Sequence, residues 1–128
     1  AMNDVFWKRF FVFCGIWNLL IVGLPMALTP SFVASTSGLA LPAGDWLFVR
    51  MAGLIIATFG VGYFMVSSDL DRHRSIVTLG LIGKIAVGAM FAIYWLDGAI
   101  SFRAFLTGAS DLIFAAFFWR FLTRYPAR

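Results

Sequence analysis

The stretch IVTLGLIGKIAVGAMFAIYWL, from Ile76 to Leu96, decides the fold class. It carries a single charged residue and has the length of about 20 residues that a helix needs to cross a bilayer. Similar runs lie at about residues 10–28, 46–67 and 102–122. The sequence therefore predicts an all-α integral membrane protein, an antiparallel bundle of four transmembrane helices that forms a single domain over residues 1–128.

The composition agrees with the lipid bilayer as the environment. Of the 128 residues, 62% are hydrophobic and 12% are charged, and the mean hydropathy is +0.92. Soluble domains are about 45–50% apolar and about 25% charged, and a small soluble domain cannot bury so much apolar surface. These values exclude a soluble secreted domain, a disordered tail and a nucleic-acid-binding module. The expected partners are membrane lipids, not nucleic acid.

The connections between the four runs differ in character. The long loop, residues 29–45, contains Pro30, Gly38, Pro42 and Gly44, which interrupt regular structure. We expect this loop to lie on the membrane surface with a short helical turn, and Asp45 to cap the second span. The other two connections are short, which predicts that spans two, three and four are antiparallel neighbours.

The basic residues predict the orientation. Only Arg50 and Arg103 lie near the span ends that are expected on the same side of the membrane as the long loop. Seven basic residues lie at the opposite ends: Lys8, Arg9, Arg72, Arg74, Arg120, Arg124 and Arg128. Because cytoplasmic segments carry an excess of Lys and Arg, both termini are expected in the cytoplasm and the loop in the periplasm. We therefore expect a multi-pass protein of the bacterial inner membrane.

Lys84 and Asp111 are the residues least expected inside apolar spans. A charge at the bilayer centre costs about 2.5–3.5 kcal/mol on insertion scales. Each residue is predicted to lie roughly 13 Å from the end of its span, on helices expected to be antiparallel neighbours. This placement predicts an ion pair between Lys84 and Asp111. It could serve a ligand or only fix the helix register, and Lys84 could instead extend to the cytoplasmic surface.

Three further residues complete the candidate site. Asn18 is the strong polar group of the first span, and Arg50 that of the second, where Asp45, Asp97 or Asp111 could meet it. Tyr63, beside two glycines, is a candidate for lining a cavity. Pro25 is expected to bend the first span. The predicted ligand-binding or coupling residues are Lys84, Asp111, Asn18, Arg50 and Tyr63.

The sequence supplies few groups for catalysis or metal binding. Cys14 and His73 are the only cysteine and histidine, and all six acidic residues are Asp. This excludes an intrachain disulfide and a His-based metal cluster, and no Ser-His-Asp or Cys-His arrangement is available. We expect no catalytic residue, no metal and no cofactor.

Several short motifs occur in an order that resembles a known group of proteins. They are Asn18, Arg50 with Gly53, Gly60-Val61-Gly62-Tyr63, Asp71-Arg72-His73-Arg74, Gly80 with Gly83-Lys84, and Asp111 before Phe114 and Phe118. The chain resembles small bacterial four-span membrane proteins, loosely of the DoxX type. The resemblance implies a four-helix protein of the inner membrane. The cysteine chemistry of some DoxX-like partners does not carry over, because Cys14 stands alone.

Three functions remain open from the sequence. The first is the binding or transport of a small polar or lipophilic molecule at the Lys84, Asp111 and Asn18 centre, in a homodimer if transport is involved. The second is an accessory or assembly role in a larger membrane complex, with a structural Lys–Asp pair and the aromatic fourth span facing lipid or the partner. The third is a membrane enzyme acting on a lipid, quinone or thiol, for which Asp111, Lys84 and Tyr63 are the only acid–base candidates.

Overall fold

The computed structural model describes residues 3–39 and 42–125, and every regular element in this part of the chain is a helix. Residues 40 and 41 of the predicted loop, and Arg128, lie outside the described residues. The helices are α1 (Asp4–Ile16), the π-helix η1 (Trp17–Gly23), α2 (Leu24–Leu28), α3 (Pro30–Ser37), the 3-10 turn η2 (Ala43–Asp45), α4 (Trp46–Ser68), α5 (Arg74–Leu96) and α6 (Phe102–Arg124).

Four helices in the described ranges are long and apolar enough to cross a membrane, as predicted: Asp4–Leu28, Ala43–Ser68, Arg74–Leu96 and Phe102–Arg124. The last three lie close to the predicted spans. The first helix begins at Asp4 rather than Phe10, because Asn3 caps it by accepting a hydrogen bond from the Phe6 N–H at 3.0 Å. Hydropathy locates an apolar run, whereas a cap sets where the helix begins.

The first long helix contains one wide turn. In η1 the Leu24 N–H donates to the carbonyl of Leu19, five residues back. Pro25 follows directly; it has no N–H to donate, and its ring would crowd the carbonyl four residues earlier. A π turn before the proline accommodates this defect within the helix. The irregularity expected at Pro25 thus lies mainly in the turn that precedes it.

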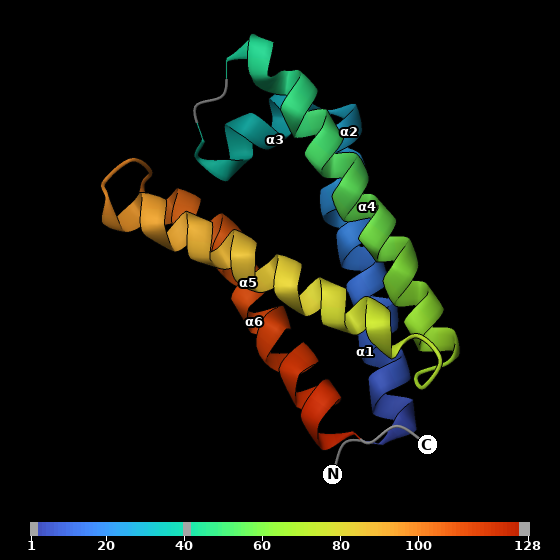
Figure 1. Cartoon of the computed structure of the whole chain (residues 1–128). Helices are drawn as coiled ribbons and strands as arrows, with labels where there is room; N and C mark the ends of the chain where they lie inside the picture. Colours follow the sequence, from blue (N-terminus) through green and yellow to red (C-terminus); the bar gives the residue numbers. More distant parts are fainter. Residues whose placement is uncertain (1–2, 40–41, 126–128) are drawn as a thin grey trace.

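The long helices are arranged as two pairs, α1–η1–α2 with α4 and α5 with α6 (Figure 1). Glycines allow the first pair to approach closely, since a Cβ built on Gly60 would lie 2.6 Å from the Leu19 nitrogen, and one on Gly23 2.6 Å from the Ala57 nitrogen. In the second pair, Gly88 faces the Leu112 side chain. Small residues at helix contacts are typical of membrane bundles.

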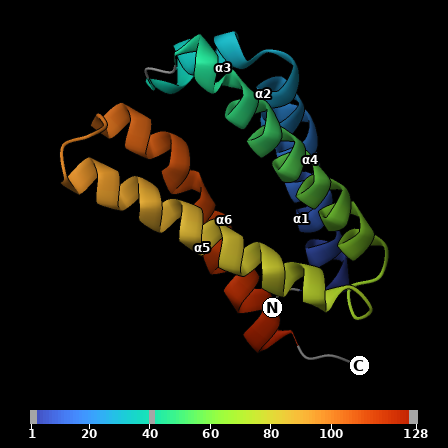
Figure 2. The ribbon, with the colours of Figure 1, turned by 45° about the horizontal axis from the view of Figure 1, so that its top comes forward.

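The two pairs converge at one end of the molecule and splay apart toward the other, as Figures 1 and 2 both show. The C-terminal half of α4 meets the N-terminal half of α5 near their connecting turn, where Gly62 contacts Ile76 and Gly80 contacts Tyr63. Beyond that point α4 follows α1 instead. The prediction that spans two and three are neighbours therefore holds only near the turn, because a short connection fixes adjacency at one end alone.

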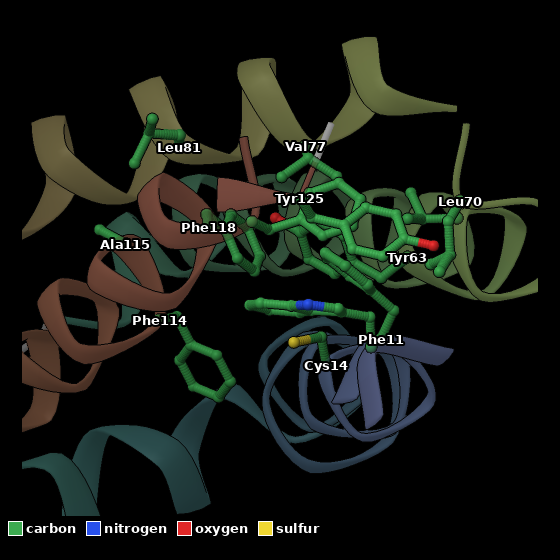
Figure 3. Close-up of a cluster of buried hydrophobic side chains, with 13 residues drawn as sticks. Phe11, Cys14, Tyr63, Leu70, Val77, Leu81, Phe114, Ala115, Phe118 and Tyr125 are labelled. Carbon is green, nitrogen blue, oxygen red and sulfur yellow. The ribbon is translucent and has the colours of Figure 1, made fainter. Parts of the chain in front are cut away.

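The hydrophobic core fills the narrow end of this wedge. Side chains from α1, α4, α5 and α6 meet there, including Phe11, Tyr63, Val77 and Phe118 (Figure 3). Rings of α1 pack directly against rings of α6, with centroids 5.1 Å apart for Trp7 and Phe121. The core is thus largely aromatic and joins the two pairs.

The aromatic residues of α6 do not form the outward surface that the accessory hypothesis assumed. Phe114, Phe118 and Phe121 are buried in the core, and Phe117 packs against it. Of this group, only Trp119 is exposed. Composition gave no means of separating core-facing from outward-facing rings, because an aromatic side chain suits both places in a membrane protein.

Polar contacts close the narrow end. Arg74, at the start of α5, donates hydrogen bonds to the carbonyls of Tyr125 at 2.6 Å and Leu122 at 2.9 Å. Its guanidinium also stacks on Phe121, 5.0 Å from the ring centroid. The Tyr125 hydroxyl donates to the Asp4 carboxylate. These bonds join the ends of α1, α5 and α6.

At the wide end, α3 lies between the two pairs (Figures 1 and 2). It is the helical part expected within the long loop, and two bonds connect it to α6. Arg103 donates to the Thr36 carbonyl at 3.0 Å, and the Thr107 hydroxyl donates to the Ser37 carbonyl at 3.0 Å. The helix ends at Gly38, whose φ of 80° is accessible to glycine without strain.

Candidate functional site

A cavity of about 500 Å³ lies in the wedge between the two helix pairs. It borders the aromatic core on one side, and all the long helices contribute to its wall. The lining residues are Trp17, Asn18, Val22, Ile55, Ile56, Phe59, Tyr63, Gly80, Gly83, Lys84, Val87, Leu106, Thr107, Ser110 and Asp111. The wall is mostly apolar, with its polar groups gathered around Lys84.

The predicted ion pair is present on this wall. Lys84 Nζ donates to Asp111 Oδ1 at 3.1 Å. The Lys84 side chain is 7% exposed and the Asp111 side chain 25%. Lys84 therefore does not extend to a surface, and the alternative that it does is wrong. The carboxylate is the more accessible member of the pair from the cavity.

Aromatic rings surround the ammonium group of Lys84. Its nitrogen lies 4.7 Å from the centroid of the Phe114 ring, 5.8 Å from that of Tyr63 and 5.9 Å from that of Phe118. The negative faces of such rings attract a cation, most strongly where water is excluded. The rings thus hold the lysine between the core and the cavity.

Asn18 links the first helix pair to this centre. Its Oδ1 accepts a hydrogen bond from Lys84 Nζ at 3.5 Å, and its Nδ2 donates to the Ile56 carbonyl at 3.4 Å. Asn18 is the second residue of the π turn η1. Turns of this kind are frequent at functional sites because they redirect side chains. The sequence therefore predicted three residues that the structure brings together: Lys84, Asp111 and Asn18.

Tyr63 also lies on the cavity wall, as predicted. It is 1% exposed, and its hydroxyl packs on Gly80, where an added Cβ would lie 2.5 Å from the oxygen. Gly80, one α-helical turn before Lys84, leaves room for the Tyr63 ring beside the lysine. The ring is thus both a core residue and part of the cavity wall.

Arg50 does not belong to the site. Its Nη1 donates to the carbonyl of Ala27 at 2.6 Å, and it does not line the cavity. None of the three predicted carboxylates pairs with it. The reason is the pairing of α4 with α2, whose last turn offers free carbonyl oxygens to the arginine. Arg50 thus joins α4 to α2 within the first helix pair, at the wide end of the wedge.

The cap predicted at Asp45 is also absent. Asp45 makes no side-chain hydrogen bond to the start of α4. Its φ of −87° and ψ of −4° are near-helical, because the 3-10 turn η2 leads directly into the helix. A capping side chain needs an extended backbone at this position.

Three cavity-lining residues were not among the predicted site residues: Trp17, Thr107 and Ser110. Thr107 and Ser110 line the cavity within one turn of Asp111 on α6. Their helical spacing from Asp111 was a usable signal. Trp17 precedes Asn18 in the π turn, and no feature of the sequence alone placed its ring on the cavity wall.

The site combines one ion pair, the Asn18 amide and the hydroxyls of Tyr63, Thr107 and Ser110 with an apolar wall. Such a mixture of a few polar groups and extensive apolar surface is typical of small-molecule sites, whose volumes are about 300–1,000 Å³. Within residues 3–39 and 42–125, no three His, Cys, Asp or Glu side chains are placed to hold a metal ion.

Comparison of the chain with family models, with curated proteins and with solved structures finds no match. The resemblance to DoxX-type proteins therefore stays a prediction from the residues quoted above.

Proposed function

We propose that this chain is a four-span protein of the bacterial inner membrane that binds or translocates a small or lipophilic molecule in the cavity beside Lys84 and Asp111. The observation that carries the proposal is an ion pair on the wall of a ligand-sized, mostly apolar cavity. A pair that only fixed helix register would gain nothing from facing open space, since empty space beside a polar group leaves it without partners.

The outer surface supports insertion into a membrane. Large apolar side chains on every long helix face outward, among them Leu20, Leu54, Ile82 and Ile113, which are 52% exposed or more. Water-soluble monomers rarely expose continuous apolar surface on this scale. In a lipid bilayer this surface contacts acyl chains instead of water, so its exposure carries no hydrophobic free-energy penalty.

The charges support the orientation with both termini in the cytoplasm. The start of α1, the end of α6 and the turn between α4 and α5 lie at the same end of the molecule (Figure 1). The basic residues predicted on the cytoplasmic side that the structure describes belong to these segments: Lys8, Arg9, Arg72, Arg74, Arg120 and Arg124. The positive-inside rule then favours the narrow end of the wedge as the cytoplasmic one.

Native mass spectrometry of the protein released from lipid nanodiscs tests the proposal. We expect a defined extra mass on the wild type that is lost in Asp111→Asn, together with the mass of a monomer or homodimer. Asp97→Asn is the matched control, because it removes the same charge at the end of α5, outside the cavity. It should keep the extra mass.

An equal absence of extra mass from all three proteins would contradict the proposal and favour an accessory role for the chain. A larger membrane partner retained in mild detergent would then be the expected finding, and the Lys84–Asp111 pair would be structural.

A further inference from the structure

The polar groups on the cavity wall differ in what they still offer a ligand. Lys84 already donates two of its three N–H bonds, to Asp111 and Asn18, and directs its remaining charge at Phe114. Asn18 has both its oxygen and its nitrogen engaged. The donors of Lys84 and Asn18 are therefore largely used within the protein, which leaves the Tyr63 hydroxyl and the Trp17 indole N–H as the other donors on the wall.

The acceptors, in contrast, retain free capacity. Asp111 accepts from Lys84 through Oδ1, and a carboxylate has room for about four hydrogen bonds. The Thr107 hydroxyl donates its proton to the Ser37 carbonyl, and the Ser110 hydroxyl donates to the Thr107 carbonyl at 3.3 Å. Both hydroxyl oxygens can then only accept. A ligand that satisfies the part of the wall around Asp111 must donate a hydrogen bond, and its own oxygen can accept one from Tyr63 or Trp17.

The charge of the wall selects among donors. With Lys84 and Asp111 3.1 Å apart, the pair is neutral as a unit. An ammonium head near Asp111 would meet repulsion from Lys84 that offsets part of its attraction to the carboxylate. A carboxylate head would bring further acceptors to a wall already rich in them. A neutral hydroxyl donates without adding charge.

The rest of the cavity suits a hydrocarbon body. Ile55, Val87 and Leu106 line it, yet they are between 43% and 59% exposed. The cavity therefore opens onto the apolar outer surface of α4, α5 and α6. In a membrane this opening faces acyl chains, so a lipid-soluble molecule reaches the polar wall without crossing water.

We infer that the occupant is a neutral lipid alcohol, with one hydroxyl donating to Asp111 and an apolar body lying between the two helix pairs. This inference rests on the proposed function and adds the chemical class of the ligand to it. Entry is lateral, from the bilayer.

The test uses four probes with the same twelve-carbon body, about the length that a cavity of this volume holds. They are 1-dodecanol, its methyl ether, dodecylammonium and, at pH 9, dodecanoate. Each is added at equal concentration to nanodiscs with the wild type, with Lys84→Met/Asp111→Leu or with Asp97→Asn, and the retained mass is read by native mass spectrometry. Empty nanodiscs give the background.

We expect dodecanol to be retained at least tenfold more than the methyl ether, which has no proton to donate, since hydrogen bonds to charged groups are the stronger ones. Retention should fall to background in the double variant, which removes the carboxylate acceptor and both charges from the cavity wall. It should be unchanged in Asp97→Asn.

Preferential retention of dodecylammonium or dodecanoate would overturn the alcohol assignment and leave the proposed function standing. Equal retention of the alcohol and its methyl ether would also overturn the alcohol assignment and leave the proposed function standing. An endogenous mass that none of the four probes displaces would have the same consequence. If neither a probe nor an endogenous mass is retained on the wild type, both the assignment and the proposed function are wrong.

Discussion

Replacing the two members of the ion pair singly and together gives an unequal and strongly coupled pattern of stability. The variants are Lys84→Met and Asp111→Leu, which replace each charged side chain with an apolar one. The asymmetry follows from burial, because the Lys84 side chain is 7% exposed and the Asp111 side chain 25%.

Asp111→Leu leaves the lysine charge buried among aromatic rings with one amide oxygen as its partner, and we expect a loss of about 3–5 kcal/mol in the free energy of unfolding. Lys84→Met leaves the carboxylate on the cavity wall, where it is less buried than the lysine, and we expect a smaller loss of about 1–3 kcal/mol. Removing both charges together is often close to neutral, so the coupling energy should be about 4–8 kcal/mol, the sum of the two single losses.

The assay is reversible unfolding in mixed micelles titrated with a denaturing detergent, followed by tryptophan fluorescence. The control cycle is Lys8→Met with Asp97→Leu, two exposed residues at opposite ends of the molecule, whose effects should add to within about 0.5 kcal/mol. Additive effects in the Lys84–Asp111 cycle, or a larger loss for Lys84→Met than for Asp111→Leu, would refute this account of the site.

Three further outcomes are expected. Arg74→Lys keeps the charge but loses the paired bonds to the end of α6, so the same assay should give a loss of about 1–3 kcal/mol; an unchanged value would contradict the role assigned to Arg74. Gly60→Val should cost about 1–3 kcal/mol, because its Cβ would overlap the η1 backbone at Leu19, whereas Gly83→Ala, with no atom within 4 Å of its Cβ, should stabilise the helix by about 0.5–1 kcal/mol. Arg103→Ala removes one of the bonds that hold α3 to α6, so amide hydrogen exchange over residues 30–37 should accelerate, measured by mass spectrometry; unchanged protection there would show that the bond does not hold α3.

The sequence predicted the long helices well because apolar length is a local property. Each run of about 20 apolar residues bounded by charges is visible without knowledge of its neighbours. The Lys84–Asp111 pair was predictable for a related reason, since a charge placed within an apolar span needs a partner. The short connection between the last two helices left few choices for that partner.

The pairing of helices distant in sequence was not predictable in the same way. α4 follows α1 because Gly23, Gly53 and Gly60 bring the two backbones together, and such contacts depend on both helices at once. The misassignment of Arg50 has this origin, since its partner is a backbone carbonyl of α2 and not a side chain. Every residue has a backbone carbonyl, so the distribution of charged residues in the sequence does not indicate which one accepts the bond.

The wedge has a mechanical consequence. Its narrow end is fixed by stacked rings and by Arg74, whereas at its wide end Arg103 and Thr107 connect α3 to α6 through two hydrogen bonds. A helix of 23 residues such as α5 is a rigid lever about 35 Å long, so a swing of about 5° about the narrow end moves its far tip by about 3 Å. The cavity lies near the middle of this helix, at Lys84 and Val87, so the same rotation changes the separation of the two pairs there by about 1–2 Å, while the aromatic packing at the narrow end stays nearly unchanged.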